Sequence, residues 1–163
     1  MAKLDDLVKR IERLEAESEI RKIVDDYCLK QDKRQLDAFL SIMTDDFCLT
    51  FPGWNLNLQG KENIKKFYED VIYPGNEYNL HQVTNLDIKV NGSKAEAESY
   101  HILHIKTVKG DLQEAYGRYQ FQFRKEGGRW KLARVDTFAT LWEGTQAPQD
   151  PAAYERFPWP PKK

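Results

Sequence analysis

Histidine and cysteine are scarce in this chain of 163 residues, which contains three histidines and two cysteines. Cys28 and Cys48 each lie in a short apolar run, which is typical of buried thiols in a reducing compartment and not of a disulfide framework. The N-terminal residues contain no apolar signal core. Together these absences predict a cytoplasmic protein.

The chain also lacks an excess of positive or negative side chains, and it contains no long apolar run. Lys and Arg number 25 against 26 Asp and Glu, for a net charge of -1, whereas a nucleic-acid partner requires a strong positive field. The apolar runs span only a few residues, far short of the roughly 20 that a membrane-spanning helix needs. We therefore expect neither a nucleic-acid partner nor a membrane one. The 40% of hydrophobic residues suffices for the core of one domain.

The first thirty residues are predicted to be helical. Leu4, Leu7, Ile11 and Leu14 recur at steps of three and four residues, the stripe of an amphipathic helix. The next apolar position is Ile20, and this six-residue step breaks the phase, so the segment is either two helices or one helix with two faces. We expect the first stripe to contact another subunit, which predicts a homo-oligomer, and the second to face the domain's own core.

Downstream, the periodicity predicts two further helices, a short strand and then four long strands. The helices are expected at about 33–43 and 61–72, and the short strand at 45–51. A two-residue alternation then predicts strands at 77–90, 93–109, 112–126 and 129–142. Tight turns at Asn91-Gly92 and Gly127-Gly128 would join these strands into an antiparallel meander. The expected fold class is α+β, with three helices packed on a long curved antiparallel sheet.

Residues 148–163 form a proline-rich tail, in which neither a helix nor a central strand is expected. Its aromatic residues Tyr154, Phe157 and Trp159 predict that it lies against the body. A simple ordered tail, a flap at a pocket mouth and a subunit contact all stay open. The expected organisation is a single domain over 1–147, with a helical extension at about 1–15, followed by this tail.

The histidines are the first candidates for chemistry. His101 and His104 lie three residues apart on one predicted strand, so their side chains should point to opposite faces, with Tyr100 on the face of His104. The chain has no Cys or His spacing typical of a metal site and no glycine-rich phosphate loop. We therefore expect neither a metal nor a nucleotide cofactor. Arg118, Arg124 and Arg134 are expected in surface ion pairs.

Several segments resemble the SnoaL-like branch of the nuclear transport factor 2-like superfamily. EIRKIVDDYCLKQDKRQLDAFLSIMTDDF is similar to the opening of these proteins, GKENIKKF to their third helix and HQVTN to a strand signature. The resemblance covers about residues 15–142 and implies a cone-shaped α+β fold. The branch includes polyketide cyclases, scytalone dehydratase, a hexachlorocyclohexane dehydrochlorinase and bile-acid 7α-dehydratase, and the resemblance implies a dimer or a trimer.

The same resemblance implies a set of site residues. These dehydratases pair an aspartate after the first helix with a histidine on the first long strand, which are Asp32 and His81 here. Tyr27 stands at the spacing of a tyrosine of the bile-acid enzyme, and His104 falls at a further polar position on the next strand. Beside this set we expect a mostly apolar and aromatic pocket wall, with the candidates Phe47, Phe51, Trp54, Asn85, Tyr100, Phe138 and Trp142.

This set would suit elimination chemistry without a cofactor. A histidine is the natural base for a carbon-bound proton, and a buried carboxylate fixes its tautomer and stabilises the imidazolium. Tyr27 and His104 would bind or protonate an oxygen. The implied function is a cofactor-independent lyase or isomerase of the dehydratase type, a carbon–oxygen lyase by its reaction, acting on a hydrophobic, cyclic small molecule.

Other interpretations stay open. The functional arginine of the dehydrochlorinase falls at Val135 here, which makes dehydrochlorination itself an unfavoured reaction. Asp32 could be only a helix cap, because Gln35 follows it at capping-box spacing. Tyr27 could be a core residue, and His104 an ordinary strand residue. The function could instead be that of a polyketide-cyclase-like enzyme, or of a non-catalytic binding or accessory subunit similar to the small subunit of ring-hydroxylating dioxygenases.

Overall fold

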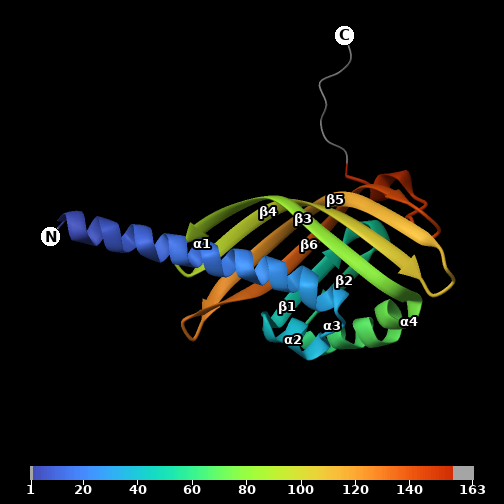
Figure 1. Ribbon diagram of the computed structural model, residues 1–163, viewed down its shortest axis with the longest axis horizontal. Coiled ribbons are helices and arrows are strands. Elements are labelled where there is room, and N and C mark those ends of the chain that lie inside the picture. The colour runs from blue at the N-terminus through green and yellow to red at the C-terminus, as the bar shows by residue number, and fades with distance from the viewer. Residues whose placement is uncertain (1, 156–163) are drawn as a thin grey trace, which may run out of the picture.

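A computed structural model describes residues 2–155 and places a helical layer on the concave face of one curved sheet (Figure 1). The helical elements are α1 (Ala2–Asp32), α2 (Leu36–Ser41), η1 (Pro52–Trp54), α3 (Lys61–Phe67), η2 (Tyr68–Ile72), α4 (Tyr73–Gly75) and η3 (Pro151–Ala153). The strands are β1 (Met43–Phe51), β2 (Leu56–Gln59), β3 (Asn76–Asn91), β4 (Lys94–Thr107), β5 (Leu112–Glu126) and β6 (Arg129–Glu143). The α+β class and the four long strands are confirmed.

The sheet has the strand order β2-β1-β6-β5-β4-β3 and is curved without closing. The four long strands form the expected antiparallel meander. A purely antiparallel sheet was the wrong expectation, however, because β1 pairs with β6 in parallel. The last strand of the meander, β6, lies beside β1 and runs in the same direction, so the sheet is mixed. The short edge strand β2, which pairs with β1, has no counterpart in the sequence-based prediction.

β-Bulges contribute to the curvature of the sheet. The register between β3 and β4 shifts between Thr84 and Asp87, where Asn85 adopts a left-handed conformation with a φ of 57°. A second shift lies between Tyr116 and Gly117 in β5. Each bulge bends its strand and increases the local twist. The shift at Asn85 also decides which histidines face the helices.

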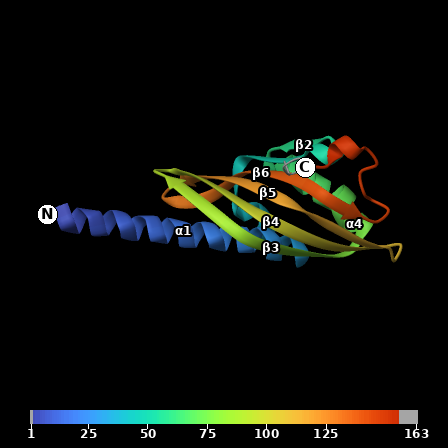
Figure 2. The ribbon, with the colours of Figure 1, turned by 90° about the horizontal axis from the view of Figure 1, so that it is seen from above.

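The α1 helix is continuous over 31 residues, so one helix with two faces is the correct alternative (Figures 1 and 2). Its first buried side chain is Ala16, and its N-terminal part extends clear of the sheet in both views. Leu4, Leu7, Ile11 and Leu14 are 48–65% exposed. Beyond Ala16 the apolar face packs into the main core together with aromatic residues of α2 and β5 such as Phe39 and Phe121. None of the helices described is long and apolar enough to cross a membrane.

The region after α1 differs from the expected helix at 33–43. Asp32 is the last residue of α1, and α2 begins only at Leu36. The N-cap position of α2 is Gln35, and its side chain makes no capping hydrogen bond. Arg34 takes a left-handed φ of 53°, which separates the two helices. The capping interpretation of Asp32 is therefore wrong, and its carboxylate is available for another contact.

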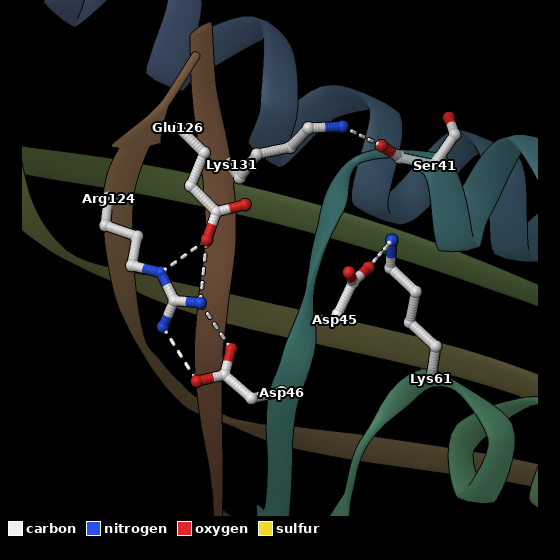
Figure 3. Close-up of polar contacts among 7 residues, drawn as sticks. All are labelled: Ser41, Asp45, Asp46, Lys61, Arg124, Glu126 and Lys131. Carbon is white, nitrogen blue, oxygen red and sulfur yellow. Dashed lines mark hydrogen bonds and ion pairs between the residues drawn. The ribbon is translucent and has the colours of Figure 1, made fainter. Parts of the chain in front are cut away.

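The three arginines form ion pairs, as expected. The guanidinium group of Arg124 on β5 donates to both carboxylate oxygens of Asp46 on β1, at 2.6 and 2.9 Å, and lies 2.7 Å from Glu126 (Figure 3). These hydrogen bonds from Arg124 lower the pKa of Asp46 to about 2. Arg118 pairs with Glu98 and Glu155, and Arg134 with Asp136. Both cysteines are buried and free, as predicted.

The described part of the proline-rich tail lies against the sheet. Tyr154 forms an isolated bridge with Ala139 on β6, and the backbone N–H of Glu155 donates to the Ala139 carbonyl at 2.7 Å. The Tyr154 hydroxyl donates to the carbonyl of Pro148 at 3.0 Å. This agrees with a tail that packs on the body. Phe157 and Trp159 lie outside the described residues.

Candidate active site

A cavity of about 360 Å³ lies between the concave face of the sheet and the helices. Small residues at inward positions of the central strands leave this space, since Ala115 and Ala139 are buried and line the cavity. Gly117 adds to the effect beside His101, because a Cβ atom there would lie 2.9 Å from the His101 ring and 1.9 Å from the Phe138 carbonyl oxygen. At the other end of the sheet, Phe121 and Phe123 fill the interior instead.

Asp32 and His81 form a pair at the wall of this cavity, which His81 lines. The His81 ring nitrogen Nδ1 lies 2.5 Å from Asp32 Oδ1, and the His81 backbone N–H donates to Asp32 Oδ2 at 2.9 Å. The two side chains are only 6% and 12% exposed. The expected hydrogen bond between these residues is therefore present. It joins the end of α1 to β3, 49 residues further along the chain.

The bonding of Asp32 defines which His81 nitrogen is available. A carboxylate that accepts a hydrogen bond from Nδ1–H leaves Nε2 as the unprotonated nitrogen of the neutral ring. His81 lines the cavity, whereas Asp32 is behind it and does not. The arrangement can therefore present a basic nitrogen to a bound molecule while its partner carboxylate stays out of reach.

His101, and not His104, is the second histidine in the cavity wall. Its ring stacks on Tyr119 with 4.0 Å between centroids, and its Nδ1 is buried without a hydrogen-bond partner. Burial, together with a smaller contribution from the nearby His81, lowers the pKa of His101 to about 3. The ring is therefore neutral near pH 7 and can exchange a hydrogen bond with a bound molecule.

The expectation for His104 was wrong. This side chain lies on the convex face of the sheet, where its Nδ1 lies 3.2 Å from Glu114 Oε1, and it is about one-third exposed. Extending the register of the Asn91-Gly92 turn would pair His81 with His104. The bulge at Asn85 shifts the pairing by one residue, so that His81 faces Leu103 and Val83 faces His101. A one-residue shift exchanges the two faces of a strand.

Four of the predicted wall residues lie elsewhere. Tyr100 shares the convex face with His104 and is 47% exposed, and Asn85 is an exposed residue of the bulge. Phe138 also lies outward, with the Arg118 guanidinium 4.7 Å from its ring centre, since Thr137 and Ala139 take the inward positions. Phe47 is fully buried in the main core and does not line the cavity.

The other three predicted wall residues line the cavity and form an aromatic cluster at one end of it. Phe51 and Trp142 stack at 5.8 Å with an interplanar angle of 14°. Trp54 contacts both of them, at 4.8 and 4.9 Å between ring centroids. Trp54 is the most exposed of the three, which places it toward the mouth.

Tyr27 lines the cavity from α1 and is almost completely buried. Burial raises the pKa of its hydroxyl above the usual range, so Tyr27 remains a neutral hydrogen-bond donor. Sequence reasoning missed its neighbours Gln31 and Tyr68, which also line the cavity. The Tyr68 hydroxyl donates to Gln31 Oε1 at 2.5 Å, and Gln31 Nε2 donates to the Tyr27 carbonyl at 2.7 Å. This network fixes the helical wall.

Within residues 2–155, no three His, Cys, Asp or Glu side chains lie close enough together to hold a metal ion. The polar groups that line the cavity are amides, hydroxyls and the two imidazoles.

We expect His101 to make folding stability depend on acid pH. The unfolded chain binds a proton at His101 below its ordinary pKa of about 6.5, whereas the folded protein does so only near 3. Stability should therefore fall as the pH drops from 6.5 toward 3. Replacing His101→Phe, which keeps a ring against Tyr119, should remove about 2 kcal/mol of the loss between pH 7 and pH 5. Urea unfolding of both proteins at both pH values measures this, and equal losses would contradict it.

These features define a class: an open α+β cone whose helices and curved sheet enclose a cavity that is lined by a histidine, with an aspartate bonded to this histidine from behind the wall. The chain belongs to the SnoaL-like domain family, which it matches over residues 12–136. No curated protein is significantly similar to it.

Solved structures share the fold at low sequence identity. A hexachlorocyclohexane dehydrochlorinase, LinA type 2, is 21% identical with a TM-score of 0.78, over 83% of this chain and 93% of that one. The type 3 enzyme from Novosphingobium barchaimii is 21% identical with a TM-score of 0.77, over 84% and 94%. A protein from Novosphingobium aromaticivorans provisionally named scytalone dehydratase is 20% identical with a TM-score of 0.74, over 80% and 88%.

Proposed function

We propose that this protein is a cofactor-independent lyase or isomerase of the dehydratase type, acting on a hydrophobic, cyclic small molecule. The observation that carries the proposal is the hydrogen bond of 2.5 Å between Asp32 and His81 at a cavity that His81 lines. A buried carboxylate and histidine of this kind form a general base. The names of the dehydrochlorinases and of the provisional scytalone dehydratase agree with elimination chemistry.

In the proposed reaction His81 Nε2 removes a proton from the carbon next to a carbonyl group. The electron pair of the broken C–H bond forms a carbon–carbon double bond, and hydroxide leaves from the next carbon. The proton on His81 then passes to this hydroxide, so that water is released and the neutral ring is restored. Asp32 stabilises the intermediate imidazolium. Tyr27 and His101 supply hydrogen bonds to the carbonyl oxygen in place of His104.

A β-hydroxytetralone tests this reaction, because it is a neutral bicyclic ketone whose loss of water gives naphthol. We expect the protein to accelerate naphthol formation, followed by absorbance, well above the buffer rate. Failure to accelerate it, together with failure on a panel of related cyclic β-hydroxy ketones and double-bond isomers, would contradict the proposal. The polyketide-cyclase-like alternative uses the same pair and would form a carbon–carbon bond instead.

A non-catalytic binding or accessory subunit is the alternative from another class. Such a protein needs a cavity but has no requirement for a carboxylate behind a histidine. It would bind ring compounds without converting them, so substitution of His81 would change no reaction rate. The buried Asp32–His81 pair is the feature that favours an enzyme over this alternative.

We also propose that the N-terminal part of α1 mediates a homo-oligomer, a dimer or a trimer. Leu4, Leu7, Val8, Ile11 and Leu14 are 46–65% exposed along this part of the helix, and an apolar stripe of this length is costly to leave in water.

We expect light scattering at micromolar concentration to show an oligomer, and Ile11→Lys to shift it toward the monomer. Asp6→Lys, which places the same side chain at another exposed position of this helix segment, is the control and should not change the assembly. A monomeric wild-type protein would contradict the proposal.

A further inference from the structure

The cavity wall carries no Asp, Glu, Lys or Arg side chain among the residues that the structure describes. We propose that the site selects uncharged ring compounds, with a flat ring at the Phe51–Trp54–Trp142 end and the reacting oxygen at the His81 end. This names the substrate class of the proposed reaction and therefore rests on the proposed function for its catalytic part. The binding preference itself follows from the wall alone.

An anionic ligand would be costly to bury in this cavity. A carboxylate or phosphate that enters the cavity loses its water and meets no fixed positive charge on the described wall. His81 could become positive, but Asp32 at 2.5 Å already balances that charge. A buried anion would then be one negative charge in excess, whereas a hydroxyl or carbonyl group needs only hydrogen bonds.

Arg34 and Arg118 serve contacts outside the cavity. Arg34, just after α1, donates to the backbone carbonyl of Asn76 and, at 3.0 Å, to that of Glu77. Its guanidinium also lies 5.2 Å from the centre of the Tyr73 ring. Arg118 pairs with Glu98 and Glu155 on the convex face. Neither side chain lines the cavity.

The aromatic end explains the preference for a flat ring. Phe51 and Trp142 are nearly parallel, at 14°, whereas Trp54 is tilted by 43° to Phe51 and by 45° to Trp142. Aromatic side chains arranged around a site favour offset-stacked or edge contacts with a further planar ring. A saturated chain would fill the same volume without those contacts.

The sheet register sets the distance between the two ends. His81, Leu103, Ala115 and Trp142 face one another across β3, β4, β5 and β6 in a single row. Three inter-strand spacings separate the backbones of His81 and Trp142 by about 14 Å along the curved sheet. A ligand packed at protein density in 360 Å³ occupies roughly 270 Å³. This admits a compound of two fused rings that reaches from one end to the other.

Naphthol and naphthoate test the preference, since they share a bicyclic ring and differ in charge at neutral pH. We expect calorimetric titration of the full chain to show naphthol binding roughly tenfold or more tighter than naphthoate. His81→Ala should keep this preference, because it removes the base and leaves the uncharged wall. Trp54→Ala should weaken naphthol binding. Equal or tighter binding of naphthoate, or no binding of naphthol at millimolar concentration, would overturn the inference.

A gain of charge makes the test sharper. Gln146 lines the cavity from the loop after β6, while Gln149 is exposed nearby and does not line it. Gln146→Lys should reverse the preference toward naphthoate, and Gln149→Lys should leave it unchanged. An unchanged preference in Gln146→Lys would count against a charge-based selection. A protein that prefers naphthol but converts no β-hydroxy ketone would support this inference and contradict the proposed function, so the two failures are distinguishable.

Discussion

His81→Ala should lower kcat for dehydration of a cyclic β-hydroxy ketone by roughly 10²–10⁴-fold, which is the usual contribution of a general base. The substitution removes Nε2, the one nitrogen of the Asp32–His81 pair that is available to a substrate. Binding of naphthol should change little, because the aromatic end of the cavity stays intact. Stopped-flow or steady-state turnover, with calorimetric binding beside it, measures both quantities.

His104→Ala is the matched control for this result. It removes a histidine from the neighbouring strand, but from the convex face, where its contact is with Glu114. We expect turnover within about twofold of the wild type. A large loss in His104→Ala, or an unaffected His81→Ala, would contradict the assignment of faces to these two strands.

Asp32→Asn should also reduce kcat strongly, by roughly 10³–10⁴-fold if it acts as in the serine-protease triad. The amide can still accept the His81 backbone N–H through its oxygen, so the fold should be kept. Its NH₂ group would then face Nδ1, which favours the ring tautomer with the proton on Nε2. The base would be blocked, and the imidazolium would lose its partner charge.

Stability separates this effect from a merely structural one. Asp32→Ala leaves the buried His81 N–H without an acceptor, which should cost about 1–3 kcal/mol of unfolding free energy, whereas Asp32→Asn should cost much less. Asp25→Asn, at an exposed position of the same helix, is the control and should affect neither quantity. A fully active Asp32→Asn protein would leave Asp32 as a structural residue only.

The strand pattern could be predicted from the sequence because each turn is encoded locally. The glycines of Asn91-Gly92 and Gly127-Gly128 take left-handed conformations, as tight turns require. The two-residue alternation between the turns predicts four long strands whose bounds agree with the structure to within two residues at every end. The parallel pairing of β1 with β6 could not be predicted in this way. It depends on where the whole meander ends relative to β1, which no local pattern records.

The Asp32–His81 pair could be predicted from the sequence, whereas the residues whose place depends on strand register could not. The family pattern at Asp32 and His81 places them at a helix end and on a strand, and the fold brings them together. His104 was expected in the site from the family position, but the bulge at Asn85 shifts the β3–β4 pairing by one residue, so that His81 pairs with Leu103 and not with His104. The available signal was Asn85 itself, since asparagine tolerates the left-handed conformation that such a bulge needs.

Proton exchange at carbon tests the central claim most directly, because it isolates the base from the leaving group. Tetralone, which has an acidic C–H bond next to its carbonyl and no hydroxyl to lose, is incubated with the protein in deuterium oxide and followed by NMR. We expect the wild-type protein and His104→Ala to replace these protons with deuterium well above the buffer rate, and His81→Ala and Asp32→Asn not to exceed it. Exchange by His81→Ala at the wild-type rate would contradict it.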